Sequence, residues 1–221
     1  IRGMLYFELV RLFAKPWNAV DPASAPGVPL ILEPTRSITE DDNATRNTVQ
    51  EVYAQAIADL TTARDLLPGS NGMYADTYVA SALLSRVYLM QGEDQKAAEA
   101  ADRVLQSDAF SLAPTFADAF NNASDIGEYI FAVQINSQDG TNDLNTFYAA
   151  STDGGRGDIN IQPQHLNRYD STDARGDFFY TDPSTGEVRT KKWQDDESDG
   201  ATIPVLRLAE LYLTRPQANL R

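Results

Sequence analysis

The chain has no cysteine and a single histidine, His165, and each shortage excludes a class of chemistry. Without cysteine there can be no disulfide, no thiolate metal site and no cysteine nucleophile. With one histidine, no metal site can use two histidine ligands. The residue types of a Ser-His-Asp triad are all present, but no GxSxG motif supports one. We therefore expect no catalytic residues, no metal site and no cofactor.

Positive charge is also scarce, because 18 Lys and Arg residues face 32 Asp and Glu residues and give a net charge of −14. This charge would repel a phosphate backbone, so nucleic acid is not expected as a partner. The acidity is interpreted as a contribution to solubility. No run reaches 18 apolar residues, which excludes a membrane-spanning helix, and no signal peptide opens the chain.

The first half of the sequence carries helical patterns. An apolar stripe through Leu5, Leu9 and Phe13 predicts a helix over residues 2–14, and a proline-rich loop over 15–45 follows it. A capping box in Thr48–Glu51 predicts the start of a helix over 48–67. Two further helices are expected at 77–91 and 94–107. Their small residues and spacing are those of a tetratricopeptide repeat, in which two helices approach closely.

The second half has a different character. Residues 128–136 predict a strand, residues 137–160 a polar loop, and the turn at 182–186 a hairpin. A final apolar helix is expected to start near Pro204 and to end or kink at Pro216. The sequence thus predicts a mainly α fold with TPR-like helical repeats over 1–110. A loop-rich part with short strands is expected over 111–221, packed with the first part as one unit.

Four blocks of the sequence resemble, in the same order, segments of the SusD/RagB family of outer-membrane nutrient-binding proteins of Bacteroidetes. The blocks are RGMLYFELVRLFAKP, NTVQEVYAQAIADLTTARDLLP, ALLSRVYLMQGEDQKAAEAADRVL, and YDSTDARGDFF followed by IPVLRLAELYL. The family has Ala-Glu-Ala after the last block, where this chain has Pro216-Gln217-Ala218. The resemblance implies an internal portion of a SusD-like protein that lacks both ends, with the lipid anchor outside this chain.

The resemblance also implies a function, namely glycan binding without catalysis. A SusD-like lipoprotein on the extracellular face of the outer membrane would capture an oligosaccharide or polysaccharide for nutrient uptake. It would deliver this ligand to a SusC-like TonB-dependent transporter. Two alternatives stay open: a helical-repeat scaffold that binds only protein, and a carbohydrate-active hydrolase, although no carboxylate pair stands in a recognisable motif. The sequence does not identify the glycan.

Sugar binding needs aromatic faces for the rings and planar polar side chains for the hydroxyls. Phe147 and Tyr148 stand in the polar loop together with Asn145, Arg156 and Asp158, and these five residues are the main candidate ligand contacts. The alternative is that the two aromatic residues only anchor the loop. Two further candidates, for which packing is the alternative, are Trp17 and Trp193.

Several short motifs are given structural interpretations. The RGD triplets at 156–158 and 175–177 are interpreted as turns rather than adhesion motifs, and Asp173-x-Arg175 as a structural part of the family signature. Carboxylates cluster at 41–43 and at 195–197, where calcium is possible, but neither cluster matches an EF-hand loop. Both clusters are therefore interpreted as solvated charge.

Overall fold

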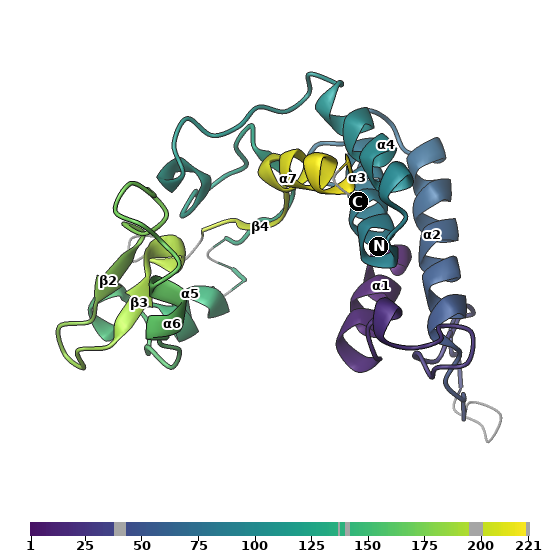
Figure 1. Cartoon of the computed structure of the whole chain (residues 1–221), viewed down its shortest axis with the longest axis horizontal. Helices are drawn as coiled ribbons and strands as arrows, with labels where there is room; N and C mark the ends of the chain where they lie inside the picture. Colours follow the sequence, from purple (N-terminus) through teal and green to yellow (C-terminus); the bar gives the residue numbers. More distant parts are fainter. Residues whose placement is uncertain (38–42, 137, 140–141, 195–200, 220–221) are drawn as a thin grey trace. The chain divides into compact units, whose positions relative to one another are not determined.

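The structure is a computed structural model that describes residues 1–37, 43–136, 138–139, 142–194 and 201–219, and its chain forms two compact units (Figure 1). The helical unit holds Ile1–Ala109 together with Leu208–Arg221, and the loop-rich unit holds Phe110–Arg207. Helices dominate and the strands are few and short, so the predicted fold class is confirmed. The change of character after residue 110 coincides with the junction of the units, but the last helix belongs to the helical unit. That the two units pack as one stays a prediction.

In its described residues, the helical unit is built from five α-helices. They are α1 (Arg2–Phe13), α2 (Val49–Leu66), α3 (Thr77–Gln91), α4 (Asp94–Leu105) and α7 (Leu208–Asn219), with the short turn η1 (Trp17–Ala19) after α1. Consecutive helices α1 to α4 pack side by side, and α7 packs on α3 and α4. No helix in the described ranges is both long and apolar enough to cross a membrane.

The predicted start of α2 and the predicted contact between α3 and α4 are both present. The Glu51 N–H donates to Thr48 Oγ1 at 3.2 Å, and the Thr48 N–H donates to Glu51 Oε2 at 2.8 Å, which completes the capping box. Ala97 and Ala101 of α4 are fully buried. The Ser85 hydroxyl of α3 donates to the Ala97 carbonyl at 2.9 Å, so the two helices are in close contact there.

The buried face of α1 differs from the predicted one. The stripe that includes Leu5 and Leu9 is exposed, and Phe13 is 66% exposed. The buried side chains are instead Tyr6, Phe7 and Val10, and the Phe7 ring packs on Tyr53 of α2 with centroids 5.8 Å apart. Because α1 has apolar residues on several sides, its periodicity alone does not decide which side packs against α2.

The last helix also starts later than predicted. Residues Ile203–Arg207 form strand β4, and α7 begins only at Leu208. Pro204 fits in β4 because a two-stranded sheet has free edges that tolerate a missing N–H donor. Pro216 does not end α7, since it lies inside the helix, which continues to Asn219. The turn before Pro216 carries the exposed side chains of Tyr212 and Leu213, so water can reach it.

The described part of the loop-rich unit contains two small antiparallel sheets. Strand β1 (Tyr129–Val133) pairs with β4, and β2 (Phe179–Thr181) pairs with β3 (Val188–Thr190) across the predicted hairpin turn. Its short helical segments are α5 (Asp143–Tyr148), α6 (Pro163–Leu166), η3 (Ala117–Ala119), η4 (Ser151–Asp153) and η5 (Lys191–Trp193). The predicted loop over 137–160 therefore contains a helix, α5, in its described part.

Aromatic rings pack against one another in this unit, where Phe120 is buried and the other rings are half-buried. Phe178 packs against Phe116 and Phe120 with ring centroids 5.3 and 5.4 Å apart. Tyr169 packs against Phe179 with ring centroids 5.6 Å apart.

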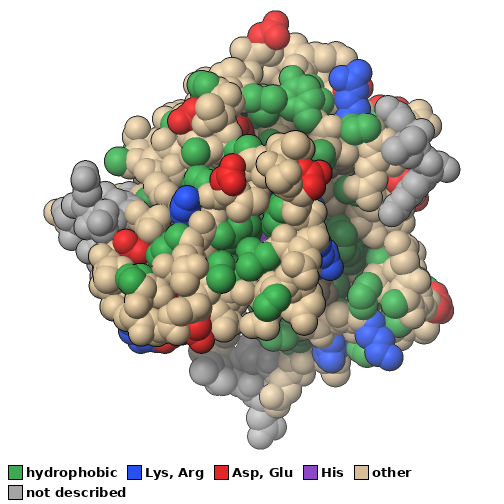
Figure 2. Space-filling view, turned by 60° about the vertical axis from the view of Figure 1, so that its left-hand side comes forward, with side chains coloured by type: hydrophobic (Ala, Val, Ile, Leu, Met, Phe, Trp, Pro, Cys, Tyr) green, Lys and Arg blue, Asp and Glu red, His purple; other side chains and the backbone are tan. Residues whose placement is uncertain are grey.

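On the face of the chain shown in Figure 2, hydrophobic side chains alternate with polar surface, and charged side chains are scattered rather than gathered into one patch.

Candidate functional site

Helix α5 carries the central aromatic residue of the candidate site, and its position is fixed at its first residue. The Leu144 N–H donates to Asn142 Oδ1 at 3.0 Å, so Asn142 caps the helix. Asn142 is itself buried, and its side-chain amide donates to the Ala201 carbonyl at 3.1 Å. The cap therefore ties α5 to the chain segment that leads into β4.

Three of the candidate side chains meet on the surface at the end of α5. Phe147 is 36% exposed, and the guanidinium carbon of Arg156 lies 5.0 Å from its ring centroid. Arg156 Nε donates to Asp158 Oδ2 at 3.0 Å. Two backbone bonds hold the segments together, from the Arg156 N–H to the Thr146 carbonyl at 2.7 Å and from the Ile159 N–H to the Phe147 carbonyl at 3.1 Å.

This arrangement offers an aromatic ring, a guanidinium and a carboxylate within one small surface. An aromatic ring provides an apolar face with a negative quadrupole, on which a sugar C–H face can stack. A guanidinium has five donors and a carboxylate accepts at both oxygens. Arg156 can therefore donate to the oxygen of a sugar hydroxyl, and Asp158 can accept a hydrogen bond from one. Both side chains are well exposed and can exchange their mutual ion pair for ligand contacts.

The neighbouring candidates Asn145 and Tyr148 lie deeper. Asn145 is only 1% exposed, and its side-chain amide donates to the Asp153 carbonyl at 3.5 Å. Tyr148 is half-buried. The exposed surface is therefore formed by Phe147, Arg156 and Asp158, with Asn145 beneath it. A direct ligand contact by Asn145 or Tyr148 stays a prediction.

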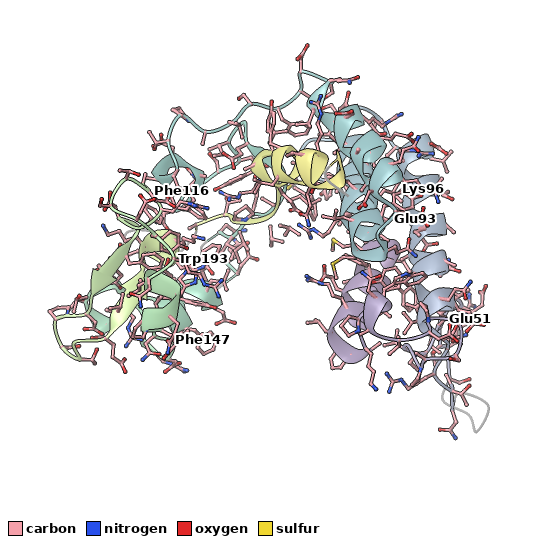
Figure 3. The ribbon with its side chains drawn as sticks, in the orientation of Figure 1. Glu51, Glu93, Lys96, Phe116, Phe147 and Trp193 are labelled. Atoms are coloured by element: carbon pink, nitrogen blue, oxygen red, sulfur yellow. The ribbon has the colours of Figure 1, made fainter. Side chains whose placement is uncertain are left out.

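The two tryptophans belong to different units. Trp193 lies in η5, which contacts α5, so it is on the same unit as Phe147 (Figure 3). Trp17 lies in η1 of the helical unit, where its ring packs on Tyr53 with centroids 4.9 Å apart. Both tryptophans are half-buried. The structure thus places Trp193 in the unit of the candidate surface, and Trp17 in the other unit.

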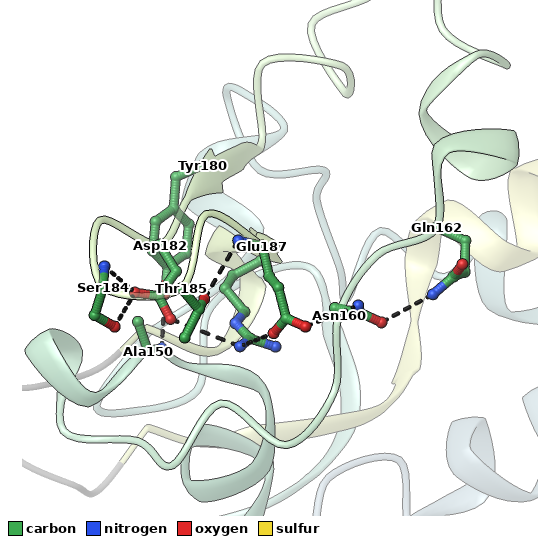
Figure 4. Close-up of polar contacts among 9 residues, drawn as sticks. Ala150, Asn160, Gln162, Tyr180, Asp182, Ser184, Thr185 and Glu187 are labelled. Atoms are coloured by element: carbon green, nitrogen blue, oxygen red, sulfur yellow. Dashed lines mark hydrogen bonds and ion pairs between the residues drawn. The ribbon is translucent and has the colours of Figure 1, made fainter.

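A polar network beneath the surface holds residues 149–162 against the β2–β3 hairpin (Figure 4). The Ala150 N–H donates to the Tyr180 hydroxyl at 2.9 Å, and the Ile161 N–H donates to the Val188 carbonyl at 2.8 Å. The Asn160 side-chain amide donates to Glu187 at 3.3 Å. These bonds connect the segment that carries Arg156 and Asp158 to a hairpin that comes later in the chain.

Arg189 is the centre of this network. It is 2% exposed, and its Nη2 atom lies 2.6 Å from Glu187 Oε2 and 3.6 Å from Asp182 Oδ2. Gly157, at a φ of 66°, packs its backbone on the guanidinium, and a Cβ atom there would lie 2.9 Å from Nη2. Only glycine combines this left-handed backbone with such a close approach. The residue between Arg156 and Asp158 therefore rests directly on the buried arginine.

Two ionisable groups of the network are strongly perturbed. Hydrogen bonds from the side chain and backbone of Ser184, together with the charge of Arg189, lower the pKa of Asp182 from 3.8 to about 2. Burial, reinforced by the neighbouring Asp153, raises the pKa of Tyr180 from 10.0 to about 12. At neutral pH the aspartate is therefore charged and the tyrosine is neutral, which are the states that the network of hydrogen bonds requires.

The sequence did not indicate this supporting layer. Asp182 is recognisable only as the first residue of the predicted turn, where an aspartate often bonds to the backbone two residues later. Arg189 sits in the middle of a short strand, and the next residue, Thr190, is buried as well, so alternation along β3 does not identify the inward side chain. An arginine on that face would ordinarily be placed in solvent.

The predicted carboxylate clusters do not supply a metal site within the described residues. No group of three or more His, Asp or Glu side chains suited to a metal ion occurs there. Asp41, Asp42 and the cluster at 195–197 lie outside the described residues. The interpretation of both clusters as solvated charge stays a prediction.

Comparisons with known proteins agree with this architecture. The model of a SusD-like family, described as "Starch-binding associating with outer membrane", matches residues 1–89. The SusD-like protein P2 of Formosa agariphila is 32% identical over 164 residues, which cover 71% of this chain and 30% of that protein.

Solved structures extend the likeness over nearly the whole chain. A protein of Bacteroides vulgatus is 28% identical with a TM-score of 0.85, and the match covers 99% of this chain and 51% of that one. A SusD-like carbohydrate binding protein from the same species is 26% identical with a TM-score of 0.76, covering 99% of this chain and 49% of that one. The chain thus spans about half the length of these structures and less than a third of the Formosa protein.

Proposed function

Because the chain belongs to the SusD/RagB family, we propose that it forms part of a cell-surface protein that captures an oligosaccharide and passes it to a TonB-dependent outer-membrane transporter. In this proposal the protein is a lipoprotein on the extracellular face of the outer membrane. Its partners are the glycan and a SusC-like transporter. It binds its ligand without chemical conversion.

The exposed group of Phe147, Arg156 and Asp158 is the observation that supports sugar binding most directly. It combines a stacking face with hydrogen-bond donors and acceptors, and its backbone rests on the buried Arg189 network. A site whose backbone is fixed before the ligand arrives loses less conformational entropy on binding. The carbohydrate-binding relative from Bacteroides vulgatus adds weight to the same interpretation.

The affinity expected of such a surface is modest. One aromatic face and a few hydrogen bonds on an open surface give dissociation constants of roughly micromolar to millimolar. Weak capture suits a protein that must release its ligand to a transporter, because tight binding would slow the transfer.

The alternative function is a helical-repeat scaffold that binds only protein. The packed helices α1 to α4 favour it, since stacked helix pairs often present binding surfaces for polypeptides. The two functions differ in a simple observable. A glycan that binds near Trp193 changes its fluorescence, whereas a protein-only scaffold shows no response to any polysaccharide.

The test is a screen of the chain against a panel of polysaccharides by tryptophan fluorescence and by retardation in polysaccharide-containing native gels. We expect at least one glycan to retard the protein and to alter its fluorescence. A panel without any response contradicts glycan binding by this chain. Reducing ends are assayed in the same mixtures, and their release would contradict the proposed absence of catalysis.

A further inference from the structure

The helical unit contains a small cavity where α2, α3 and α4 meet. It has a volume of about 280 Å³ and is lined by Arg64, Ser81, Leu84, Tyr88, Lys96, Glu99, Ala100 and Arg103. Three of these residues carry a positive charge and one carries a negative charge. Such a balance is unusual for this chain, in which acidic residues outnumber basic ones. The cavity therefore favours an anionic group over a cationic one.

The three cationic side chains at this cavity form only weak ion pairs or hydrogen bonds with other residues. Arg64 pairs with Asp65 at 2.8 Å, and Lys96 pairs with Glu93 at 3.0 Å (Figure 3). The Lys96 side chain is 57% exposed, and the carboxylates of both pairs are at least half exposed. Exposed pairs of this kind contribute little and exchange readily. Arg103 donates to the Thr77 hydroxyl over a long 3.4 Å. The hydrogen bond from Arg64, helped by the charge of Arg103, lowers the pKa of the exposed Asp65. A guanidinium has five donors, so most of those of Arg103 are left for a ligand.

The floor of the cavity is apolar, and the Ser81 hydroxyl there is already used. Leu84 and Ser81 are buried, and the Ser81 hydroxyl donates to the Thr77 carbonyl at 2.8 Å. Lys96 lies over the Tyr88 ring at 5.7 Å, so that side of the ring is covered. A sugar would need a free aromatic face and planar polar side chains. The cavity instead suits a short aliphatic stem that ends in a carboxylate.

We propose that this cavity, between α2, α3 and α4, binds the carboxylate of an acidic side chain or chain end of a polypeptide partner. Arg103, Arg64 and Lys96 contact the carboxylate, and Leu84 and Ala100 contact its aliphatic stem. The stacked helices provide a fixed frame for such a peptide contact, as in other helical-repeat proteins. This site is independent of glycan binding, because its residues lie in the helical unit and the sugar-contact candidates around Phe147 lie in the other unit.

The test uses the whole chain and a short fluorescein-labelled peptide in which glutamate alternates with alanine, followed by fluorescence anisotropy at low salt. We expect saturable binding that weakens as salt is added, because the contact is ionic. The matched peptide with glutamine in place of glutamate should not bind. Lys96→Gln and Arg103→Gln should each weaken binding by about tenfold, as expected for the loss of one charge-assisted hydrogen bond.

The control variant is Arg36→Gln, which removes the same charge from an exposed loop position outside the cavity. It should leave the peptide affinity unchanged. Melting curves identify any variant that is not folded, and Lys96→Gln is the safer of the two because its side chain is mostly exposed. An equal loss of affinity in Arg36→Gln, or no binding of the glutamate peptide, contradicts the proposal. Displacement of the peptide by oligogalacturonate would assign the cavity to an acidic sugar instead and would also overturn it.

Discussion

Arg189 shows most clearly how single residues organise the candidate site. It is a buried cation that joins β3 to the segment under Arg156 and Asp158. Within the described part of the chain, its Nε and Nη1 atoms have no hydrogen-bond acceptor. Burying unpaired donors lowers the free energy of unfolding. The presence of Arg189 is therefore better explained by the geometry that it gives the segment under Arg156 and Asp158 than by a net gain in stability.

Replacing Arg189 by methionine should nevertheless destabilise the protein. Breaking a buried ion pair by removing one partner typically costs 3–5 kcal/mol, and we expect about 3 kcal/mol because two nitrogen atoms of Arg189 lack acceptors. Urea unfolding of the variant measures this loss. The control Arg168→Met changes an exposed arginine and should stay within about 0.5 kcal/mol of the wild type. Equal stability of both variants would contradict a supporting role for Arg189.

Asp182 makes the stability of the protein depend on acid pH. Its pKa is about 2 in the folded chain and 3.8 ordinarily, so between these values the unfolded chain binds more protons. The contribution of Asp182 is therefore fully present above about pH 4 and is lost as the pH falls toward 2. Melting temperatures measured from pH 6 to pH 2 should fall less steeply for Asp182→Asn than for the wild type. The exposed Asp177→Asn serves as control, and a slope that changes equally in both variants would refute the assignment to Asp182.

At the scale of elements, the sequence predicts where a helix starts if it carries a capping motif. It does not predict which face of a short apolar helix is buried. Thr48 and Glu51 form a local motif, so α2 begins where the sequence indicates. The orientation of α1 depends on α2, and the extended form of Ile203–Arg207 depends on its pairing with β1. Helix α5 was missed because a six-residue helix is too short for periodicity to be recognised.

The close contact of α3 and α4 gives a direct test of the helical repeat. Ala101 is fully buried, so Ala101→Phe should overpack the contact and cost about 1–3 kcal/mol. The control is Ala58→Phe, which places the same side chain on an exposed position within α2. Thermal unfolding compares the two variants. An unchanged melting temperature for Ala101→Phe would contradict the close packing of these helices.

At the scale of the whole molecule, the order of motifs predicted the fold class, whereas the site could be predicted only in part. Phe147, Arg156 and Asp158 were recognised together because they are close in sequence, and one turn brings them into contact. Trp17 belongs to a different unit, which composition alone could not reveal. Arg189 reaches the candidate surface through Gly157, which lies 32 residues earlier in the chain.

The proposed place in nutrient uptake makes a prediction about the native protein. Extracted in mild detergent, it should co-purify with a large outer-membrane barrel, because transfer of a weakly bound ligand requires a transporter close by. Affinity purification from membranes followed by mass spectrometry identifies the partner. A native protein that is recovered entirely from the soluble cytoplasmic fraction would contradict both the localisation and the transporter.

The central claim is that the surface around Phe147 binds sugar, and calorimetric titration of Phe147→Ala tests it most directly. With a glycan that the screen identifies, the variant should bind about tenfold more weakly, since a lost aromatic contact is worth about 1.4 kcal/mol. The free energy of unfolding obtained from its melting curve should fall by no more than about 1 kcal/mol, because Phe147 is partly exposed. Tyr74→Ala, which removes a 71% exposed aromatic residue from the helical unit, should bind like the wild type. Unchanged affinity of Phe147→Ala together with a lower melting temperature would show that Phe147 only anchors its segment, and would contradict the account.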